Sequence, residues 1–295
     1  MSNKESFLEH LRFEKRYSVH TLRSYQTDLE QFFDYCNKTA PGQTELTADF
    51  RLIRSWVVSL IDKGDTPRTV NRKITTLKSF YRYLLKRQMI TSNPMDKVLS
   101  PKQSKRLPAF VEEDRIKLLL DDYEFGDDFS GIRNRLLIEV FYITGMRLSE
   151  LTNLRQGDID YYNLTIRVLG KRNKERLIPF HQAYRKIFTD YKRLKDETFS
   201  DPGHDFFFVT DKGKPLYAKF VYRVVSRYLR LVTTMEKRSP HVLRHTFATH
   251  MLNRGADLNA IKEILGHASL SATQVYTHNT FEKLRNIYKQ AHPRA

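Results

Sequence analysis

The stretch that decides the fold begins at Ser239 and reads S-P-H-V-L-R-H-T-F-A-T-H-M-L-N-R-G, ending at Gly255. Ser239 is a favourable N-cap and the proline after it suits the first helical position, so we expect a helix to begin here. His241 and Arg244 lie three residues apart and share one face of its first turn. Free N–H groups and the helix dipole attract anions at this end. We therefore expect a phosphate to bind there through the paired N–H groups of the Arg244 guanidinium, with His241 donating or accepting a proton.

The same stretch continues from Asp257 to His278 as D-L-N-A-I-K-E-I-L-G-H-A-S-L-S-A-T-Q-V-Y-T-H. Asp257 can cap a second helix, which is expected to end at Gly266. His267 and Tyr276 follow that glycine. Two further side chains that carry protons therefore lie close in sequence to the expected phosphate site.

A zinc site is the competing interpretation, because His241 and His245 are spaced four residues apart. Val242 stands where a zinc protease places its catalytic glutamate, however, and no cysteine or acidic cluster lies nearby. We therefore expect no metal site. His245 and His250 are expected to be structural side chains with satisfied hydrogen bonds.

The composition indicates a nucleic-acid partner. The chain has 295 residues, enough for two domains, and its formal net charge of +17 is spread along its length. Such an excess of cations favours a polyanion, most simply nucleic acid. The single cysteine, Cys36, excludes an internal disulfide framework and is expected to be buried and inert in a reducing cytosol. The sequence shows neither the apolar core of a signal peptide nor the ~20 apolar residues of a membrane span, so we expect a soluble, cytoplasmic protein.

Apolar residues recur at helical spacing through residues 1–99, which predicts an all-α module of about four helices. The second helix is expected to run from Ser18 to Cys36. Thr47 can cap the third helix, and the fourth is expected to begin at Thr66, which precedes a proline.

Cations crowd the polar face of the expected fourth helix, which carries almost no acid to balance them. An ordinary solvated face is the alternative, but the imbalance favours contacts with phosphates. Residues 100–108 carry further cations between two prolines, which predicts a linker that either crosses a DNA backbone or serves as a plain tether. The candidate DNA-contacting residues are Arg68, Arg72, Lys73, Lys78, Lys102 and Lys105.

From residue 109 the pattern mixes helical and alternating segments. A strongly apolar helix is expected over residues 132–143, and Arg147 opens the next helix after a glycine turn. Residues 165–169 and 175–178 alternate like strands on either side of G-K-R-N-K, which predicts a β-hairpin whose basic tip contains Lys171. The other expected elements are a strand over residues 206–209 and helices over residues 112–120, 183–194 and 220–232.

Four segments resemble the motif blocks of the tyrosine recombinases, also called the phage integrase family: T-G-M-R-L-S-E-L (144–151), G-K-R-N-K-E-R-L-I-P (170–179), H-V-L-R-H-T-F-A-T-H-M-L (241–252) and L-G-H-A-S-L-S-A-T-Q-V-Y-T-H (265–278). The likeness is strongest to the chromosomal Xer recombinases of bacteria. It implies a SAM-like, all-α core-binding domain over 1–99 and, after the linker at 100–108, a catalytic domain over 109–295. That second domain would be mixed α+β, mostly helical with a small antiparallel sheet, and would end in a tail helix over 279–295.

The resemblance also implies a covalent mechanism. Tyr276 would attack the scissile phosphate and form a 3′-phosphotyrosyl link, freeing a 5′-hydroxyl group. Arg147 and Arg244 would hold the non-bridging oxygens, and Lys171 would protonate the leaving oxygen. Because the phosphotyrosine retains the energy of the broken bond, neither ATP, a metal nor another cofactor is expected.

Three more residues complete the implied site. His241 is the general acid/base candidate, His267 would hydrogen-bond the phosphate, and Glu150, one turn after Arg147, would orient the site from behind. Elementary chemistry is consistent with these roles, because a phenol with a pKa near ~10 needs a proton acceptor and a positive field to attack at neutral pH. Fixed guanidinium forks meet the developing negative charge with little reorganisation.

The implied function is Xer-type resolution of chromosome dimers during chromosome segregation, at a double-stranded, dif-like DNA recombination site. The working form would be a tetramer on two duplexes, with a related Xer recombinase and a DNA translocase as further candidate partners and no membrane. The alternatives are an integrase or transposase of a mobile element, a type IB topoisomerase, and a DNA-binding regulator with a dead recombinase fold. The tail helix would pack either on its own domain or on a neighbouring protomer through Phe281, Leu284, Ile287 and Tyr288.

Overall fold

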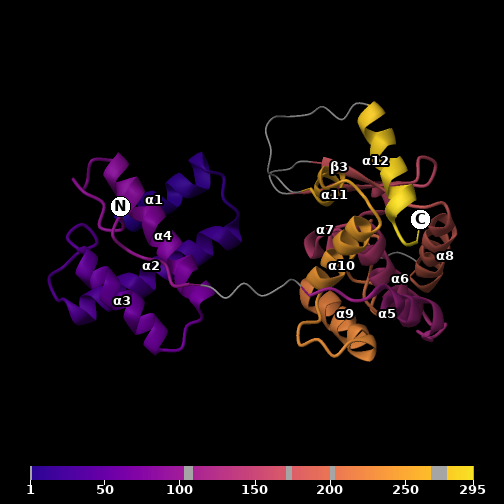
Figure 1. Cartoon of the computed structure of the whole chain (residues 1–295), viewed down its shortest axis with the longest axis horizontal. Helices are drawn as coiled ribbons and strands as arrows, with labels where there is room; N and C mark the ends of the chain where they lie inside the picture. The colour runs from indigo at the N-terminus through magenta and orange to yellow at the C-terminus, as the bar shows by residue number, and fades with distance from the viewer. Residues whose placement is uncertain (1, 103–108, 171–174, 200–202, 267–277, 295) are drawn as a thin grey trace. The chain divides into compact units, whose positions relative to one another are not determined.

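The structure is a computed structural model that describes residues 2–102, 109–170, 175–199, 203–266 and 278–294 (Figure 1). The chain forms two compact units, Met1–Arg106 and Leu107–Ala295. Each unit has its own hydrophobic core. Within the described ranges, no helix combines the length and the apolar content needed to cross a bilayer.

The first unit is all-α, as predicted. The hydroxyl groups of Ser18 and Thr66 cap its second and fourth helices by accepting from N–H groups three residues further on. The predicted Thr47 cap is wrong: Asp49 takes this place, because its carboxylate accepts from the Leu52 N–H at 2.9 Å. The elements of this unit are α1 (Asn3–Glu9), which continues as a π-helical turn (His10–Glu14), α2 (Val19–Thr39), α3 (Phe50–Asp62) and α4 (Pro67–Lys86).

Aromatic side chains fill the core of the first unit. Phe32 and Trp56 are buried, and their rings pack edge to face with centroids 5.0 Å apart. Cys36 belongs to the same core, and burial raises the pKa of its thiol to about 11. The prediction of a buried cysteine is confirmed, and because a thiol that stays protonated at neutral pH is a poor nucleophile, we expect Cys36 to be inert.

The second unit is mostly helical and carries a small antiparallel sheet of order β1-β2-β3, as predicted. The strands of the hairpin pair with Arg167 opposite Leu177, and the short strand β1 adds to the edge formed by β2. The tip of the hairpin, with Lys171, lies outside the described residues. The strands are β1 (Ile159–Asp160), β2 (Thr165–Leu169) and β3 (Glu175–Pro179).

The strand expected over residues 206–209 is wrong. Phe206 and Val209 each form an isolated bridge, with Arg155 and Pro215 respectively, and no ladder is present there. This run is apolar because Phe207 and Phe208 are buried in the core, and burial does not require a sheet. The helices of the unit are α5 (Glu113–Lys117), which continues as a π-helical turn (Leu118–Asp122), α6 (Phe129–Thr144), α7 (Leu148–Thr152), α8 (Ala183–Thr198), α9 (Ala218–Val232), α10 (Pro240–Asn253), α11 (Leu258–Leu265) and α12 (His278–Ala291).

Helix α6 is buried on most sides, and α10 packs against it (Figure 1). It ends at Gly145, which has a φ of +58°, the left-handed conformation that favours glycine. A Cβ at this position would lie 2.6 Å from Cδ1 of Phe247 on α10. The glycine therefore allows α6 to stop directly against α10, and its carbonyl group faces a side chain that α10 carries.

Candidate active site

The C-terminal end of α11 anchors three arginines from three other elements. The last carbonyls of a helix have no partner within the helix and carry partial negative charge, which suits a cation. Arg147 is the N-cap of α7, Arg176 lies on β3 and Arg244 lies on the first turns of α10. We name these three residues the arginine cluster. Each donates one hydrogen bond of 2.7 Å to a successive carbonyl: Arg176 to Ile264, Arg244 to Leu265 and Arg147 to Gly266.

Arg244 is also held by the end of α6. Its second terminal nitrogen donates to the Gly145 carbonyl at 2.6 Å. The guanidinium group thus bridges the C-terminal ends of two helices, and Arg244 is buried. Burial, followed by the nearby charge of Arg147, lowers the pKa of Arg244 to about 10, which still leaves it charged at neutral pH.

Glu150 on α7 joins the other two arginines. It accepts from the terminal nitrogens of Arg176 with both oxygens at 2.8 Å, and from Nη1 of Arg147 at 2.8 Å. It also accepts from the Arg147 backbone N–H at 2.7 Å, which completes the cap of α7. Burial alone would raise the pKa of Glu150, but the hydrogen bonds and charges of Arg176 and Arg147 lower it to about 2.

The cluster has an excess of positive charge. Among the residues that the structure describes, three guanidinium groups face one carboxylate and the remaining acceptors are neutral carbonyl groups, so two positive charges are uncompensated there. Guanidinium groups bind phosphates through paired N–H donors in a fixed plane. The arrangement can therefore bind an anion and stabilise negative charge that develops on it.

His241 lies one turn before Arg244 on α10, and its side chain is exposed. Within the described part of the chain it makes no hydrogen bond, so its imidazole is available to a bound group. His250 is different: it is buried and its Nδ1 lies 2.9 Å from the hydroxyl of Tyr142, so the prediction of a structural histidine is confirmed, but its buried Nε2 has no hydrogen-bond partner among the described residues, so the predicted satisfaction is only partial. Burial also lowers the pKa of His245. Among the described residues no set of three or more potential metal ligands comes together.

The structure brings together part of the site predicted from the sequence. Arg147, Arg244 and Glu150 meet at the end of α11, while Lys171, His267 and Tyr276 lie outside the described residues. Arg176 is the member that our sequence interpretation misses. The available signal is its strand position, because the alternation in E-R-L-I-P turns an arginine towards the core.

The candidate DNA-contacting residues of the first unit differ in how far their side chains are exposed. Arg68 and Lys102 are exposed, Lys78 is half-buried, and Lys105 lies outside the described residues. Lys73 must be corrected, because its amine is buried and donates to Asp65 at 2.7 Å. The prediction considered only the acids on α4, whereas this partner comes from the turn before the helix.

Arg72 also has an acidic partner, on α2. Its guanidinium group pairs with the buried carboxylate of Asp28 and donates to Ser24 Oγ at 2.6 Å. About half of the Arg72 side chain remains exposed, so this ion pair fixes the side chain without removing it from the surface.

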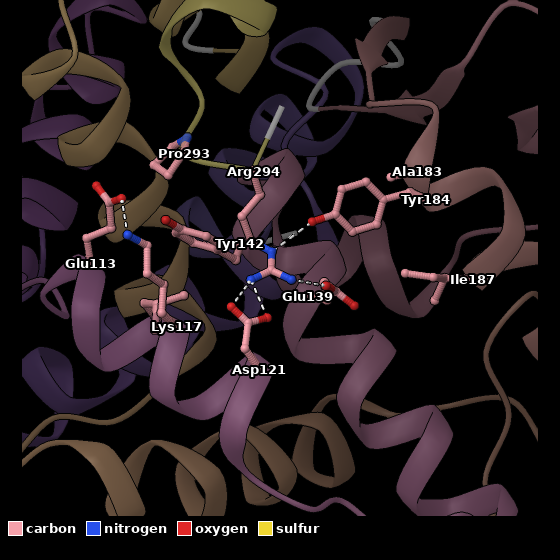
Figure 2. A pocket seen from close by; sticks show the side chains of 11 residues that line it. Glu113, Lys117, Asp121, Glu139, Tyr142, Ala183, Tyr184, Ile187, Pro293 and Arg294 are labelled. Atoms are coloured by element: carbon pink, nitrogen blue, oxygen red, sulfur yellow. Dashed lines mark hydrogen bonds and ion pairs between the residues drawn. The ribbon is translucent and has the colours of Figure 1, made fainter.

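A pocket of about 380 Å³ lies elsewhere in the second unit and shares no residue with the arginine cluster. Figure 2 shows Arg294 from the end of the chain pointing between side chains of α5, the turn after it, α6 and α8. Its guanidinium group forms two bonds with Asp121, of 2.8 and 3.0 Å, one with Glu139 at 3.1 Å and one with the Tyr184 hydroxyl at 3.0 Å. The tail therefore docks on its own unit in this structure.

Two family models match this sequence. The phage integrase family matches residues 97–283, and the N-terminal SAM-like domain of phage integrases matches residues 5–88. The two matches together span both compact units of the chain.

Known proteins are similar over nearly the whole length. Tyrosine recombinase XerC of Chlorobaculum parvum is 38% identical and covers 99% of this chain and 94% of its own, and XerC of Bacillus subtilis is 36% identical and covers 98% and 95%. The solved structure of the Tn1549 transposon integrase in complex with circular intermediate DNA has a TM-score of 0.72 at 20% identity, covering 96% of this chain and 98% of its own, which shows a shared fold. The chain thus belongs to the phage integrase family: it is a tyrosine recombinase, a site-specific enzyme that cleaves and rejoins DNA.

Proposed function

We propose that this tyrosine recombinase is of the Xer type and that it acts in the cytoplasm, on double-stranded DNA, to resolve chromosome dimers during chromosome segregation. The observation that carries the proposal is the arginine cluster, whose uncompensated charge suits a phosphate and its transition state. The XerC relatives, which are 36–38% identical, support the Xer role. An integrase or transposase of a mobile element has less support.

In the proposed reaction, the phenol of Tyr276 passes its proton to His241, and its oxygen forms a bond to the scissile phosphorus while the bond to the 5′ oxygen breaks. The strand ends as a 3′-phosphotyrosine, and the 5′ oxygen takes a proton from Lys171. Attack by a 5′-hydroxyl group reverses these steps, restores a phosphodiester and releases the tyrosine. The bond energy is conserved throughout, so the reaction consumes no ATP and uses no metal.

The positions of Arg147, Arg244, Glu150 and His241 support their other proposed roles, and the role of His267 rests on the family resemblance. Arg147 and Arg244 hold the non-bridging oxygens, and because backbone carbonyls already fix both groups, little reorganisation accompanies the development of charge. Glu150 keeps Arg147 in orientation. The exposed His241 exchanges a proton with the reacting groups, and His267 donates a hydrogen bond to the phosphate.

The first unit is proposed to be the core-binding domain, over residues 1–99, joined by the linker at 100–108 to a catalytic domain over 109–295. Lys73 is not among the proposed contacts with DNA, because its amine is buried against Asp65. Asp28 holds Arg72 in a fixed position at the surface, which lowers the entropy that a phosphate contact would cost. The proposed contacts to the DNA backbone are Arg68, Arg72, Lys78, Lys102 and Lys105.

The proposed working form is a tetramer on two duplexes at a dif-like site, with a related Xer recombinase and a DNA translocase as partners. In the structure the tail docks on its own unit through Arg294. Exchange of the tail between neighbouring protomers would therefore require the release of these contacts first.

Tyr276→Phe tests the function. DNA sites bound by this variant are first selected from a random-sequence duplex pool, and nicked suicide duplexes of the selected site are then incubated with each protein. We expect no covalent complex with Tyr276→Phe and nearly unchanged DNA affinity, because the substitution removes the attacking oxygen alone. Tyr162→Phe is the matched control, since Tyr162 is 91% exposed and is not a member of the arginine cluster. A covalent complex formed by Tyr276→Phe would refute the assignment of the nucleophile.

Two further measurements separate this function from its alternatives. Cleavage should persist in excess EDTA, because no step uses a metal ion. A supercoiled plasmid without the selected site should stay supercoiled, whereas efficient relaxation would indicate a type IB topoisomerase.

A further inference from the structure

We propose that Arg176 is a positioning residue for strand cleavage: it fixes Arg147 through Glu150 and fixes Arg244 through the last turn of α11. This inference rests on the proposed function, in which Arg147 and Arg244 hold the scissile phosphate. Arg176 is buried, and its contacts are with protein groups, so it acts on the reaction through its neighbours.

The first contact of Arg176 determines the plane of the Glu150 carboxylate. A fork of two hydrogen bonds of 2.8 Å allows one orientation of a carboxylate, whereas a single bond leaves it free to rotate. Arg147 depends on that orientation twice, through its Nη1 and through its backbone N–H. Without the fork, Glu150 would remain attached to Arg147 but would no longer hold it in one place.

The second contact of Arg176 fixes the position of the last turn of α11. Its Nε donates to the Ile264 carbonyl at 2.7 Å, and Leu265, the next residue, accepts from Arg244. A Cβ on Gly266 would lie 3.1 Å from Cδ and from Nη1 of Arg176, so the arginine side chain also lies directly against the turn. Arg176 thus helps to hold the carbonyl groups that anchor Arg147 and Arg244 against β3.

Arg176 also connects the parts of the chain that carry the other candidate residues. It lies on β3, five residues after Lys171 in sequence, and it contacts Glu150 on α7 and Ile264 in the last turn of α11, three residues before His267. A shift of about 1 Å in reacting groups can slow a reaction by about 10²-fold. A residue that links three such elements is therefore placed to affect the rate more than the affinity.

Arg176→Lys tests the inference, with Arg133→Lys as the matched control. Arg133 is also buried in the second unit and pairs with a carboxylate, Asp211, at 2.8 Å, but shares no partner with the cluster. We expect both variants to lose thermal stability. At saturating protein, Arg176→Lys should form the covalent complex about 10- to 100-fold more slowly, with a Kd for DNA within about twofold of wild type. Arg133→Lys should react at the wild-type rate.

A double-mutant cycle with Glu150→Gln tests whether Arg176 acts through Glu150. If it does, the double variant should be about as slow as the slower single variant, because residues of one unit are not additive. Multiplied rate losses would overturn the inference, and so would an Arg176→Lys rate equal to that of Arg133→Lys. If Arg176→Lys does not fold, the double variant Arg176→Met/Glu150→Gln takes its place, because it leaves no carboxylate without a partner. Its rate is compared with the rate of the Glu150→Gln single variant. Failure of the wild-type protein to react would instead overturn the proposed function.

Discussion

Two clusters in the second unit hold buried or half-buried arginine side chains, and they differ in the sign of their surplus charge. In the arginine cluster, Glu150 is the single carboxylate among three guanidinium groups, and backbone carbonyls provide the other acceptors. In the pocket of the tail, Arg294 meets two carboxylates, Asp121 and Glu139, and the hydroxyl of Tyr184 (Figure 2). We name this second group the tail cluster.

The difference shows how the same side chain serves two purposes. The carboxylates of the tail cluster neutralise Arg294, so its hydrogen bonds fasten the end of the chain and leave no demand for an external anion. Carbonyl groups fix the geometry of Arg147 and Arg244 without cancelling their charge. Charge that is held in place and left unneutralised is what a phosphate in its transition state requires.

The largest expected difference is in the rate of cleavage. Arg244→Ala or Arg147→Ala should slow formation of the covalent complex by about 10²–10³-fold, because each removes a charge that stabilises the transition state. Arg294→Ala should change the rate on a half-site duplex, which binds one protomer, by less than about threefold. Single-turnover rates and DNA affinities of the three variants provide the measurement. Equal losses of rate and affinity for Arg147→Ala would indicate a binding role.

A smaller difference is expected in stability. Glu150→Gln should lower the free energy of unfolding by about 3 kcal/mol, because it leaves buried guanidinium groups without their carboxylate. Glu139→Gln should cost less than about 1 kcal/mol, because Arg294 keeps both bonds to Asp121. Burial already raises the pKa of Glu139, so its charge contributes less. Urea unfolding of both variants measures the two costs, and similar values would contradict the comparison.

A third difference is expected in acid sensitivity. Burial lowers the pKa of His292, next to the tail cluster, to about 3, whereas a released tail would titrate near 6.5. Above pH 6.5 the histidine is neutral in both states and docking is at full strength. As the pH falls below 6.5, the released tail binds a proton that the docked tail does not, so docking weakens by about 1.4 kcal/mol per pH unit until the pH nears 3.

The arginine cluster should respond only at lower pH. The pKa of Glu150 falls from an ordinary 4.5 to about 2, so its contribution is complete above pH 4.5 and is lost as the pH falls towards 2. Between pH 6.5 and 4.5 we therefore expect faster hydrogen exchange in α12 and unchanged exchange in α11, after correction for intrinsic rates. His292→Gln should remove the pH dependence of α12. Equal protection of α12 at pH 7 and pH 5 would refute this assignment.

Local patterns predict much of this fold. Ser18, Thr66 and Asp257 cap helices where the sequence indicates, because a cap depends on residues three positions away or fewer. The hairpin strands are confirmed for the same reason, since alternation and a turn are local signals. No local pattern in the sequence indicates which residues are buried against elements that are distant in the chain. The apolar run over 206–209 therefore suggests a strand, although Phe207 and Phe208 enter the core from irregular chain.

The sequence by itself determined the two-part organisation, most of the helices, the excess of positive charge, and the motif blocks whose resemblance to the tyrosine recombinases implies site roles for Arg147, Glu150 and Arg244. The tertiary structure decided which charges are neutralised. Lys73 and Arg294 are paired by acids from other elements, while Arg176 supports the cluster from a strand, far in sequence from the helix that carries Arg244. The reason is physical: a periodic pattern records which face of an element is buried, whereas an ion pair depends on which elements meet when the chain folds.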